Sequence, residues 1–267
     1  LRNVALKRLR PDLRDQPEFV GALRREARVL GGLEHPAILP VYELGVDDDG
    51  LTYYTMRKMT GRTLGDILRQ LQLGDPETSG HWPLRRLVGV FVQIAQAMHY
   101  AHGRFVVHRD LKPENVLMGE LGEVQICDWG VAKKLDRDPA ADGVIIGTPA
   151  YMSPEQAHGR DSEVDARADV YSLGVMFYEA LTLRRPYSGE TSQQQLEACK
   201  NVVPLPPSAV ARDRLTPPDL ETLCLRMLEK RRERRTASMR DVYEALQAFL
   251  AGDLERLILI HDDRLDE

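Results

Sequence analysis

The sequence predicts an α+β fold in which strands gather near the amino terminus and helices fill most of the remainder. Residues 1–9 and 51–56 are short runs of β-branched and apolar residues, which are typical of strands. In contrast, residues 165–181 are apolar on nearly every side, and no charged residue stands between Asp169 and Glu179. This pattern indicates a buried central helix rather than a surface one.

The length and composition describe an ordinary soluble globular chain. Its 267 residues can bury a substantial core, in one large domain or in two lobes. The net charge of −5 gives no nucleic-acid footprint, and no run of about 18 apolar residues could span a bilayer. The three cysteines lack metal-ligand spacing, so a reducing compartment is the simpler expectation. Because the chain begins with Leu1 rather than Met, we expect a segment of a longer protein, located in the cytoplasm or on the cytoplasmic side of a membrane-anchored parent.

The first helix is predicted to begin at Asp15-Gln16-Pro17-Glu18, which combines a cap, a first-turn proline and an early acid. It ends at Gly31-Gly32, and its apolar face comprises Phe19, Leu23, Ala27 and Leu30. Glu26 lies beside this face, where a solvated helical charge is the plain interpretation. After a linker and a strand over residues 35–45, Asp47-Asp48-Asp49-Gly50 predicts a hairpin turn before the second strand.

Helices are predicted through most of the chain beyond residue 60. Residues 63–72 form a short helix, and residues 74–82 form a polar surface loop. An amphipathic helix then follows from the apolar spacing of Leu84, Leu87, Phe91, Ile94, Met98 and Ala101. Two short strands are expected at 116–118 and 124–127. Further helices at roughly 190–200, 218–229 and 239–252 precede an acidic tail or linker at 253–267.

Two groups of potential metal ligands have a simpler structural interpretation. The triple aspartate at 47–49 lacks the alternating ligands and terminal Glu of a calcium loop, so a solvated turn is expected. His99 and His102 lie three residues apart on a helix without a third ligand. We expect them to have packing or surface roles.

Chemistry-bearing side chains concentrate in the run from Val106 to Asn115, followed thirteen residues later by Asp128-Trp129-Gly130. A loop and the end of a hairpin can bring Asp110, Asn115 and Asp128 to one point. Three oxygen-bearing side chains there suit a Mg²⁺ ion that also holds phosphate oxygens. Lys112 adds a positive charge at the same place. The pattern therefore indicates phosphoryl transfer.

This run resembles the catalytic loop and metal-binding triplet of eukaryotic-like (Hanks-type) serine/threonine protein kinases of the bacterial type, H-R-D-L-K-P-E-N and D-F-G, with Trp129 in place of Phe. The resemblance extends from residue 1 to about residue 252. It implies a bilobal fold: a small lobe of antiparallel strands and one helix in residues 1–59, ending in a hinge, and a large, mainly helical lobe in residues 60–252. Residues 253–267 would be the tail or linker.

The resemblance assigns catalytic roles to residues of the large lobe. Asp110 would orient the acceptor hydroxyl and take its proton, while Lys112 would neutralise the transferring phosphoryl group. Asn115 and Asp128 would hold two Mg²⁺ ions. Thr148, in a Gly-Thr-Pro-Ala-Tyr-Met-Ser-Pro-Glu run, resembles the threonine that contacts the catalytic base and lysine in serine/threonine kinases.

The same resemblance implies an ATP site between the lobes. Lys7, paired with Glu26, would hold the α- and β-phosphates. Met56 would lie at the back of the adenine pocket, Leu117 would form its floor, and the hinge residues Arg57, Lys58 and Met59 would offer backbone groups to the base.

Two anchoring interactions are also implied. Asp169 would accept hydrogen bonds from the backbone of the catalytic loop, which would satisfy a buried carboxylate. Glu155 would be buried against Arg235, although the arginine-rich run 231–235 leaves that register open by one residue.

One departure from the family concerns the nucleotide lid. Kinases place a glycine-rich hairpin immediately before the lysine strand, and this chain begins only six residues before Lys7. We therefore expect an open nucleotide site, weak ATP affinity and poor turnover for the segment alone.

A second departure concerns activation. No Ser, Thr or Tyr occurs between Gly130 and Thr148, although in many relatives the arginine equivalent to Arg109 binds a phosphorylated residue of this stretch. Our hypothesis from the sequence is that an aspartate of the stretch, Asp142 or else Asp136 or Asp138, pairs with Arg109 instead. The alternative is a flexible acidic loop.

The sequence thus predicts a protein serine/threonine kinase that uses ATP and Mg²⁺ and acts on a protein hydroxyl. A pseudokinase that serves as a binding or scaffold module is the alternative from another class, and a small-molecule kinase is a third. The expected partner is a protein substrate, with a homodimer left open. No nucleic acid and no membrane contact within this segment are expected.

Overall fold

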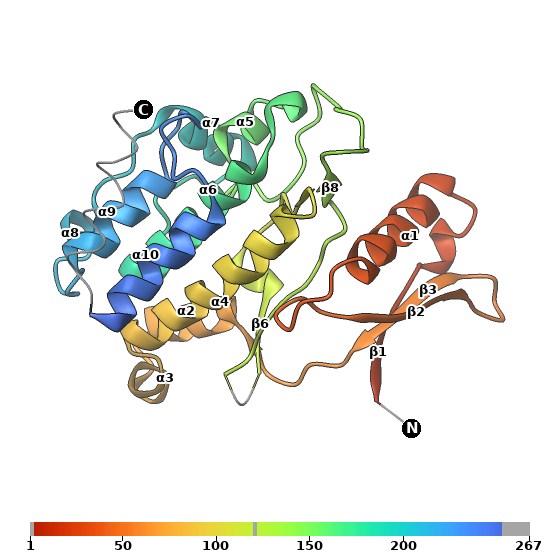
Figure 1. Cartoon of the computed structure of the whole chain (residues 1–267), viewed down its shortest axis with the longest axis horizontal. Coiled ribbons are helices and arrows are strands. Elements are labelled where there is room, and N and C mark those ends of the chain that lie inside the picture. Colours follow the sequence, from red (N-terminus) through yellow and green to blue (C-terminus); the bar gives the residue numbers. More distant parts are fainter. Residues whose placement is uncertain (1–2, 120–121, 253–267) are drawn as a thin grey trace.

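The computed structural model describes residues 3–119 and 122–252, so the expected tail at 253–267 lies outside the described residues. Two lobes are visible in Figure 1: a small lobe with a sheet and one long helix, and a large lobe built mainly of helices. This arrangement confirms the predicted bilobal fold. No helix within the described residues is both long and apolar enough to cross a membrane.

The small lobe contains an antiparallel sheet of three strands in the order β1-β3-β2. The strands are β1 (Val4–Arg8), β2 (Val41–Val46) and β3 (Thr52–Arg57). Lys7 lies on the edge strand β1 and pairs with Tyr54 on the central strand β3. The β2–β3 turn is held by the side chain of Asp47, which accepts hydrogen bonds from the amides of Asp49 and Leu51. This confirms the hairpin turn predicted at Asp47-Asp48-Asp49-Gly50.

Helix α1 (Pro17–Gly31) covers the sheet and begins at the predicted proline. Leu23, Ala27 and Leu30 of the predicted apolar face are buried, whereas Phe19 is 41% exposed. The N-cap position is Gln16 rather than Asp15, and no side chain caps the helix. Glu26 is buried, which contradicts the interpretation of it as a solvated charge.

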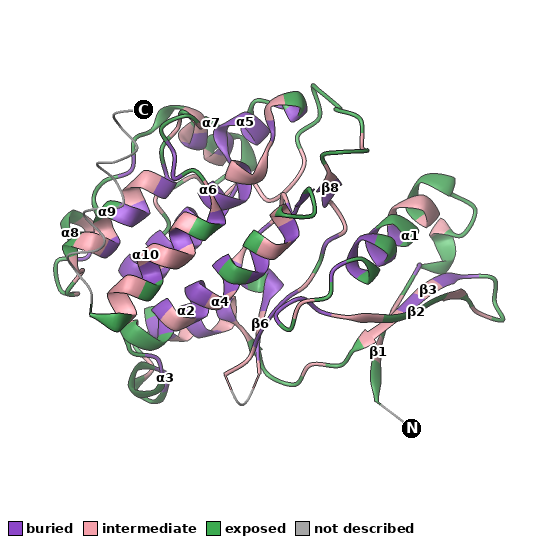
Figure 2. Cartoon of the chain, viewed as in Figure 1, coloured by how far each residue is buried: buried purple, intermediate pink, exposed green. Residues whose placement is uncertain are grey.

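The large lobe is organised around helix α6 (Ala166–Thr182), which is almost entirely buried, as Figure 2 shows. Its lack of charge through the middle explains this position, because a helix that is apolar all round is stable only inside a core. The neighbouring predicted helices are present: α2 (Leu64–Gln72), α4 (Leu84–His102), α7 (Ser192–Asn201), α9 (Pro218–Met227) and α10 (Met239–Ala251). The amphipathic pattern of the sequence therefore located the main helices correctly.

The prediction of a surface loop at 74–82 is wrong, because α3 (Pro76–His81) lies there. Asp75 caps this helix by accepting a hydrogen bond from the Thr78 amide at 2.7 Å, and a proline occupies its first turn. These are helix-start signals that outweigh the polar composition. The short helices α5 (Pro154–Ala157) and α8 (Pro207–Val210) were also not predicted.

Short strands shape the surroundings of the catalytic loop. Strands β4 (Arg62–Thr63), β6 (Val116–Met118) and β7 (Val124–Ile126) form one small sheet, and β5 (Val106–Val107) pairs with β8 (Lys133–Lys134) in another. Three-residue 3-10 turns occur at Pro11–Leu13, Pro113–Asn115 and Asp161–Glu163. The β6–β7 hairpin confirms the two strands predicted on either side of residue 120.

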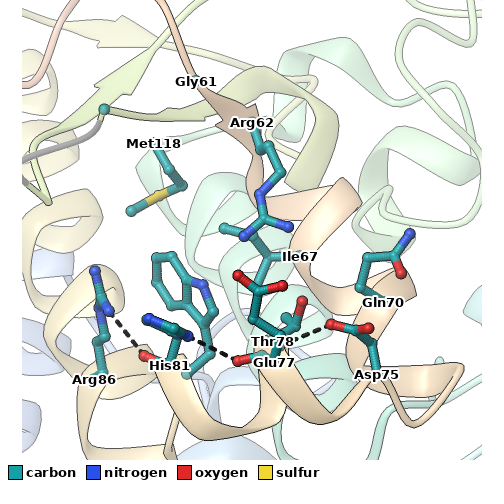
Figure 3. A pocket seen from close by; sticks show the side chains of 12 residues that line it. Gly61, Arg62, Ile67, Gln70, Asp75, Glu77, Thr78, His81, Arg86 and Met118 are labelled. Carbon is teal, nitrogen blue, oxygen red and sulfur yellow. Dashed lines mark hydrogen bonds between the residues drawn. The ribbon is translucent and has the colours of Figure 1, made fainter.

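A pocket of about 550 Å³ lies in the large lobe between α2, α3, α4 and β6 (Figure 3). Trp82 lines it, with the guanidinium of Arg86 stacked 4.3 Å from the ring centroid. None of the residues predicted to act in catalysis lines this pocket. The candidate site is therefore defined by hydrogen bonds around the catalytic loop.

Candidate active site

The catalytic loop is anchored by Asp169 in the first turn of α6. Its carboxylate accepts hydrogen bonds from the amides of His108 and Arg109, both at 2.9 Å, and lies 2.8 Å from Nε2 of His102. Complete burial would raise the pKa of Asp169, but the hydrogen bond from His102 and the neighbouring charges and amide outweigh it and lower that pKa. The amide contacts are those expected for Asp169. His102, for which only a packing or surface role was expected, instead hydrogen-bonds to this carboxylate.

Asp110 lies where the loop takes an unusual backbone conformation. Arg109, immediately before it, has a φ of 65°, a region that residues other than glycine rarely adopt. The two amide contacts to Asp169 hold one side of this peptide. On the other side, Nε2 of Gln156 donates to the Arg109 carbonyl at 2.7 Å. The strained residue is thus held by side chains on α6 and α5.

The carboxylate of Asp110 has two close partners and a third, Asn115, whose Nδ2 lies 3.5 Å from Oδ2. Oδ2 is 2.7 Å from Nζ of Lys112, and Oδ1 accepts a hydrogen bond from the Thr148 amide at 2.7 Å. Lys112 also donates to Oγ1 of Thr148 at 2.8 Å. Asn115 joins the group, because its Nδ2 donates to the carbonyl of Asp110 at 2.9 Å. The structure therefore brings together Asp110, Lys112, Asn115 and Thr148.

A second cluster lies at the small lobe. Nζ of Lys7 contacts both carboxylate oxygens of Glu26, at 2.7 and 2.9 Å, and lies 3.5 Å from Oδ1 of Asp128. The hydroxyl of Tyr54 donates to Glu26 at 2.9 Å, which holds the buried carboxylate in place. The lysine thus connects α1 to the start of the Asp-Trp-Gly triplet.

Trp129 is buried at 1% exposure, although its neighbour Asp128 has a side chain that is 50% exposed. Nε1 of Trp129 donates to the carbonyl of Ile126 at 3.3 Å, and the ring packs 4.6 Å from that of His108. Because the indole is held in the core, Asp128 is directed outward to Lys7. Replacement of Phe by Trp in the triplet is compatible with this arrangement.

The residues predicted to surround the adenine come from β3, from the segment that follows it and from β6. Met56 and Met59 are half-buried, and Leu117 is half-buried on β6. The amide of Arg57 donates to the carbonyl of Pro40 at 3.2 Å. This hinge amide is therefore already hydrogen-bonded and does not offer a free donor to the adenine.

The far end of the Gly-Thr-Pro run is anchored as expected. Arg235 contacts both carboxylate oxygens of Glu155, at 2.8 and 3.0 Å, and both side chains are buried. The geometry selects Arg235 from the arginine-rich run. Bidentate pairing of this kind fixes orientation as well as distance.

The hypothesis that Asp142, Asp136 or Asp138 pairs with Arg109 is wrong. Asp142 accepts hydrogen bonds from the amide and hydroxyl of Ser162, Asp136 pairs with Arg137, and Asp138 accepts from the Lys134 amide. The partner of Arg109 is a residue that the hypothesis omitted. Its Nη1 lies 2.8 Å from Oδ1 of Asp161, which follows the Ser-Pro-Glu motif.

Sequence reasoning also missed Gln156. The Ser-Pro-Glu-Gln run is a capping box, in which Ser153 and Gln156 cap each other, and this pattern could have indicated the helix start at which Gln156 lies. No comparable local signal marks Asp161, because its partners come from distant parts of the chain.

Asn115 and Asp128 fit the metal role that the resemblance implies. Nδ2 of Asn115 is committed to Asp110, which leaves its Oδ1 as the oxygen for a cation, and Asp128 is half-exposed. No group of three or more His, Cys, Asp or Glu residues within 3–119 and 122–252 could hold a metal alone. Two oxygen ligands suit Mg²⁺, which is completed by waters and phosphate oxygens.

Comparison with known proteins agrees with this geometry. The family model of the protein kinase domain matches residues 2–247. The serine/threonine-protein kinase PknD of Protochlamydia amoebophila is 34% identical over 95% of this chain and 28% of its own length. PknB of Mycobacterium tuberculosis, also a serine/threonine-protein kinase, is 36% identical over 88% of this chain and 36% of its own length. The chain therefore belongs to the protein kinase family, as a serine/threonine kinase domain of the bacterial type.

The probable serine/threonine-protein kinase SCO3848 of Streptomyces coelicolor is similar at 34% identity, again over 36% of its own length. The chain thus spans about a third of the length of these curated relatives.

Proposed function

We propose that the protein transfers the γ-phosphoryl group of ATP to serine or threonine hydroxyls of other proteins. The observation that carries this proposal is the group around Asp110, whose carboxylate is held between the Lys112 ammonium and the Thr148 amide. Phosphoryl transfer depends on positioning and charge stabilisation more than on covalent catalysis. A fixed carboxylate with a cation beside it provides both.

Asp110 orients the acceptor hydroxyl and receives its proton. Oδ1 has one partner, Oδ2 accepts from Lys112 and more weakly from Asn115, and an ionised carboxylate has about four acceptor positions. It can therefore accept one more hydrogen bond without losing those that fix it. Lys112, 2.7 Å away, stabilises negative charge that develops on the transferring group.

On the nucleotide side, Lys7 holds the α- and β-phosphates while Glu26 and Tyr54 keep it in place. Asn115 and Asp128 hold Mg²⁺, which when bound neutralises charge on the phosphate oxygens. Loss of such side chains would favour a pseudokinase that serves as a scaffold. Lys7, Asp110, Asn115 and Asp128 are all present. Their contacts support an enzyme.

A protein acceptor is favoured over a small molecule by the rigid run after Thr148. The hydroxyl of Tyr151 donates to Glu179 at 2.8 Å, and its carbonyl accepts from Ser172 at 2.8 Å. Glu155 and Arg235 hold the end of the run. A stretch fixed in this way, next to the catalytic carboxylate, is suited to support an extended peptide.

The nucleotide site is open on the side of β1 within the described residues. β1 is an edge strand of the described sheet, and Val4 and Leu6 on it are 41% and 57% exposed. The side chain of Lys7 is 39% exposed. Use of ATP and the free state of all three cysteines favour a location in the cytoplasm or on the cytoplasmic side of a membrane.

The test is transfer from γ-labelled ATP by the full-length protein in the presence of Mg²⁺, with the labelled amino acids identified after acid hydrolysis. We expect label in phosphoserine and phosphothreonine and not in phosphotyrosine. Asp128→Asn should reduce the rate by at least about a hundredfold and weaken the dependence on Mg²⁺, since it removes a charged ligand. An unlabelled acceptor protein, or label confined to a small molecule, would contradict the proposal.

A further inference from the structure

A buried group of charges lies behind the catalytic loop, centred on Asp161. Its Oδ1 is 2.8 Å from Nη1 of Arg109, and its Oδ2 is 2.6 Å from Nζ of Lys133. The three side chains are between 7% and 11% exposed. Each oxygen of one carboxylate therefore faces a different cation, away from solvent.

This carboxylate connects the catalytic loop to the activation loop, defined here as residues 131–147. Arg109 belongs to the catalytic loop, and its Nε also donates to the carbonyl of Val131 at 2.7 Å. Lys133 lies on β8 at the start of the activation loop, and the Ala141 amide, near its middle, donates to Oδ2 of Asp161 at 2.9 Å. Asp161 thus holds one point of the catalytic loop and two points of the activation loop.

The group requires that Asp161 be ionised. Burial would raise the pKa of Asp161, but hydrogen bonds from Lys133 and Ala141 and the charge of Arg109 outweigh this effect and lower the pKa. Without the carboxylate, two cations would face each other in a site with little water. Such a pair is strongly unfavourable, because a buried charge needs a partner of opposite sign.

No residue of the activation loop can be phosphorylated to take this place. The activation loop contains no Ser, Thr or Tyr. The hydroxyls that follow are engaged: Thr148 accepts from Lys112, Tyr151 donates to Glu179, and Ser153 is buried in its capping box. Each therefore has a role that a phosphate would disrupt.

The space beside Arg109 is also too small for a phosphate. The void lined by Arg109, Val144, Ile146, Gln156, Gly159, Asp161 and Val164 has a volume of about 10 Å³. That volume holds at most a single water molecule. A phosphoryl group could bind Arg109 only if Asp161 left.

We propose that Asp161 is a positioning residue that acts through Arg109 and Lys133 in place of an activation-loop phosphate. The activation loop is then held in its working arrangement as soon as the chain folds. This inference rests on the proposed kinase function and concerns its regulation. It means that the kinase needs no phosphorylation of its own chain in order to act.

The first experiment measures the kcat of the full-length wild type before and after treatment with a broad-specificity protein phosphatase. We expect the two values to agree within about twofold. An active enzyme that loses its rate on dephosphorylation would overturn the role of Asp161 while leaving the proposed function intact. A wild type with no transfer in either state would contradict both.

The second experiment compares variants of Asp161. Asp161→Asn should lower kcat by about tenfold or more, because the catalytic loop loses its fixed link to the activation loop. Asp161→Glu keeps the charge and should recover part of the rate. Asp142→Asn is the matched control, since Asp142 is an exposed carboxylate of the activation loop that contacts Ser162 and not Arg109. Its kcat should stay within about twofold of the wild type.

A double variant separates positioning from a purely structural role. Asp161→Asn/Lys133→Met removes the lysine that the single variant leaves unpaired, so thermal stability should recover. If Asp161 acts through Arg109, kcat stays low in the double variant. If kcat returns together with stability, or if Asp161→Asn has the kcat of the wild type, the proposal is overturned.

Discussion

At the scale of single residues, Gln156 shows how one buried amide connects three segments. Its Nε2 donates to the carbonyl of Arg109 at 2.7 Å and to that of Ile146 at 3.2 Å, while its Oε1 accepts from the amide and hydroxyl of Ser153. The Arg109 backbone is in a conformation that costs free energy and persists only where the surroundings impose it. Gln156 is one of the residues that impose it.

Gln156→Glu should therefore lower kcat by about ten- to a hundredfold. The substitution keeps the shape but replaces the donor group with an oxygen, which faces two carbonyl oxygens. The peptide before Asp110 loses one of its restraints. Steady-state kinetics of the variant measure the effect. The KM for ATP should change little, because the hydrogen bonds of Gln156 are to Arg109, Ile146 and Ser153 and not to residues of the nucleotide site.

Ser153→Ala is the control for loss of the capping box alone, and it should affect kcat less than Gln156→Glu does. A folded Gln156→Glu variant with the kcat of the wild type would contradict the role given to this side chain.

At the scale of elements, the sequence predicts those helices and loops whose signals are local. Helix α6 follows from its uncharged apolar run, and Asp110, Lys112 and Asn115 follow from their fixed spacing along one continuous loop. The pairing of Glu26 with Lys7 was predicted only from the resemblance to kinases, since the helix pattern alone suggested a solvated charge.

The errors have physical causes at the same scale. The polar composition of 74–82 concealed a helix whose start is signalled by Asp75 and Pro76. Asp161 was missed because its partner Arg109 is 52 residues away and the third member of the group, Lys133, is 28 residues away. The 3-10 turn Asp161–Glu163 meets the catalytic loop and β8 only in the folded chain, and no spacing along the sequence records this.

At the scale of the whole molecule, a lysine inside the large lobe links stability to pH. Nζ of Lys230 donates to the hydroxyls of Tyr171 and Tyr187 at 3.0 and 2.8 Å and to the carbonyl of Cys199. No carboxylate contacts it among the described residues. Burial, opposed by Cys199 and assisted by Arg235, lowers its pKa from 10.5 to about 8. Folding therefore favours the neutral amine.

The lowered pKa of Lys230 makes the stability of the fold depend on pH. An unfolded lysine titrates near 10.5 and the folded one near 8, so between these values the unfolded chain binds more protons and stability rises with pH. We predict that the stability of the wild type relative to Lys230→Met increases between about pH 7 and about pH 10. Denaturant unfolding at each pH measures the difference.

Lys58→Met serves as the control, because Lys58 is exposed and its replacement should give a difference that changes little with pH. A Lys230→Met difference that stayed constant over the same range would show that the lysine is not destabilised by burial.

The central claim is that the group of Asp110, Lys112 and Thr148 performs the transfer while Lys7 and Asp128 bind the nucleotide. The measurement that tests it most directly is the single-turnover rate of γ-phosphoryl transfer at saturating Mg²⁺ and ATP, for the full-length wild type and Asp110→Asn. We predict a fall of about a thousandfold in rate with the Kd for ATP unchanged, because the variant loses the proton acceptor and keeps the nucleotide contacts. A rate within about tenfold of the wild type would contradict the account.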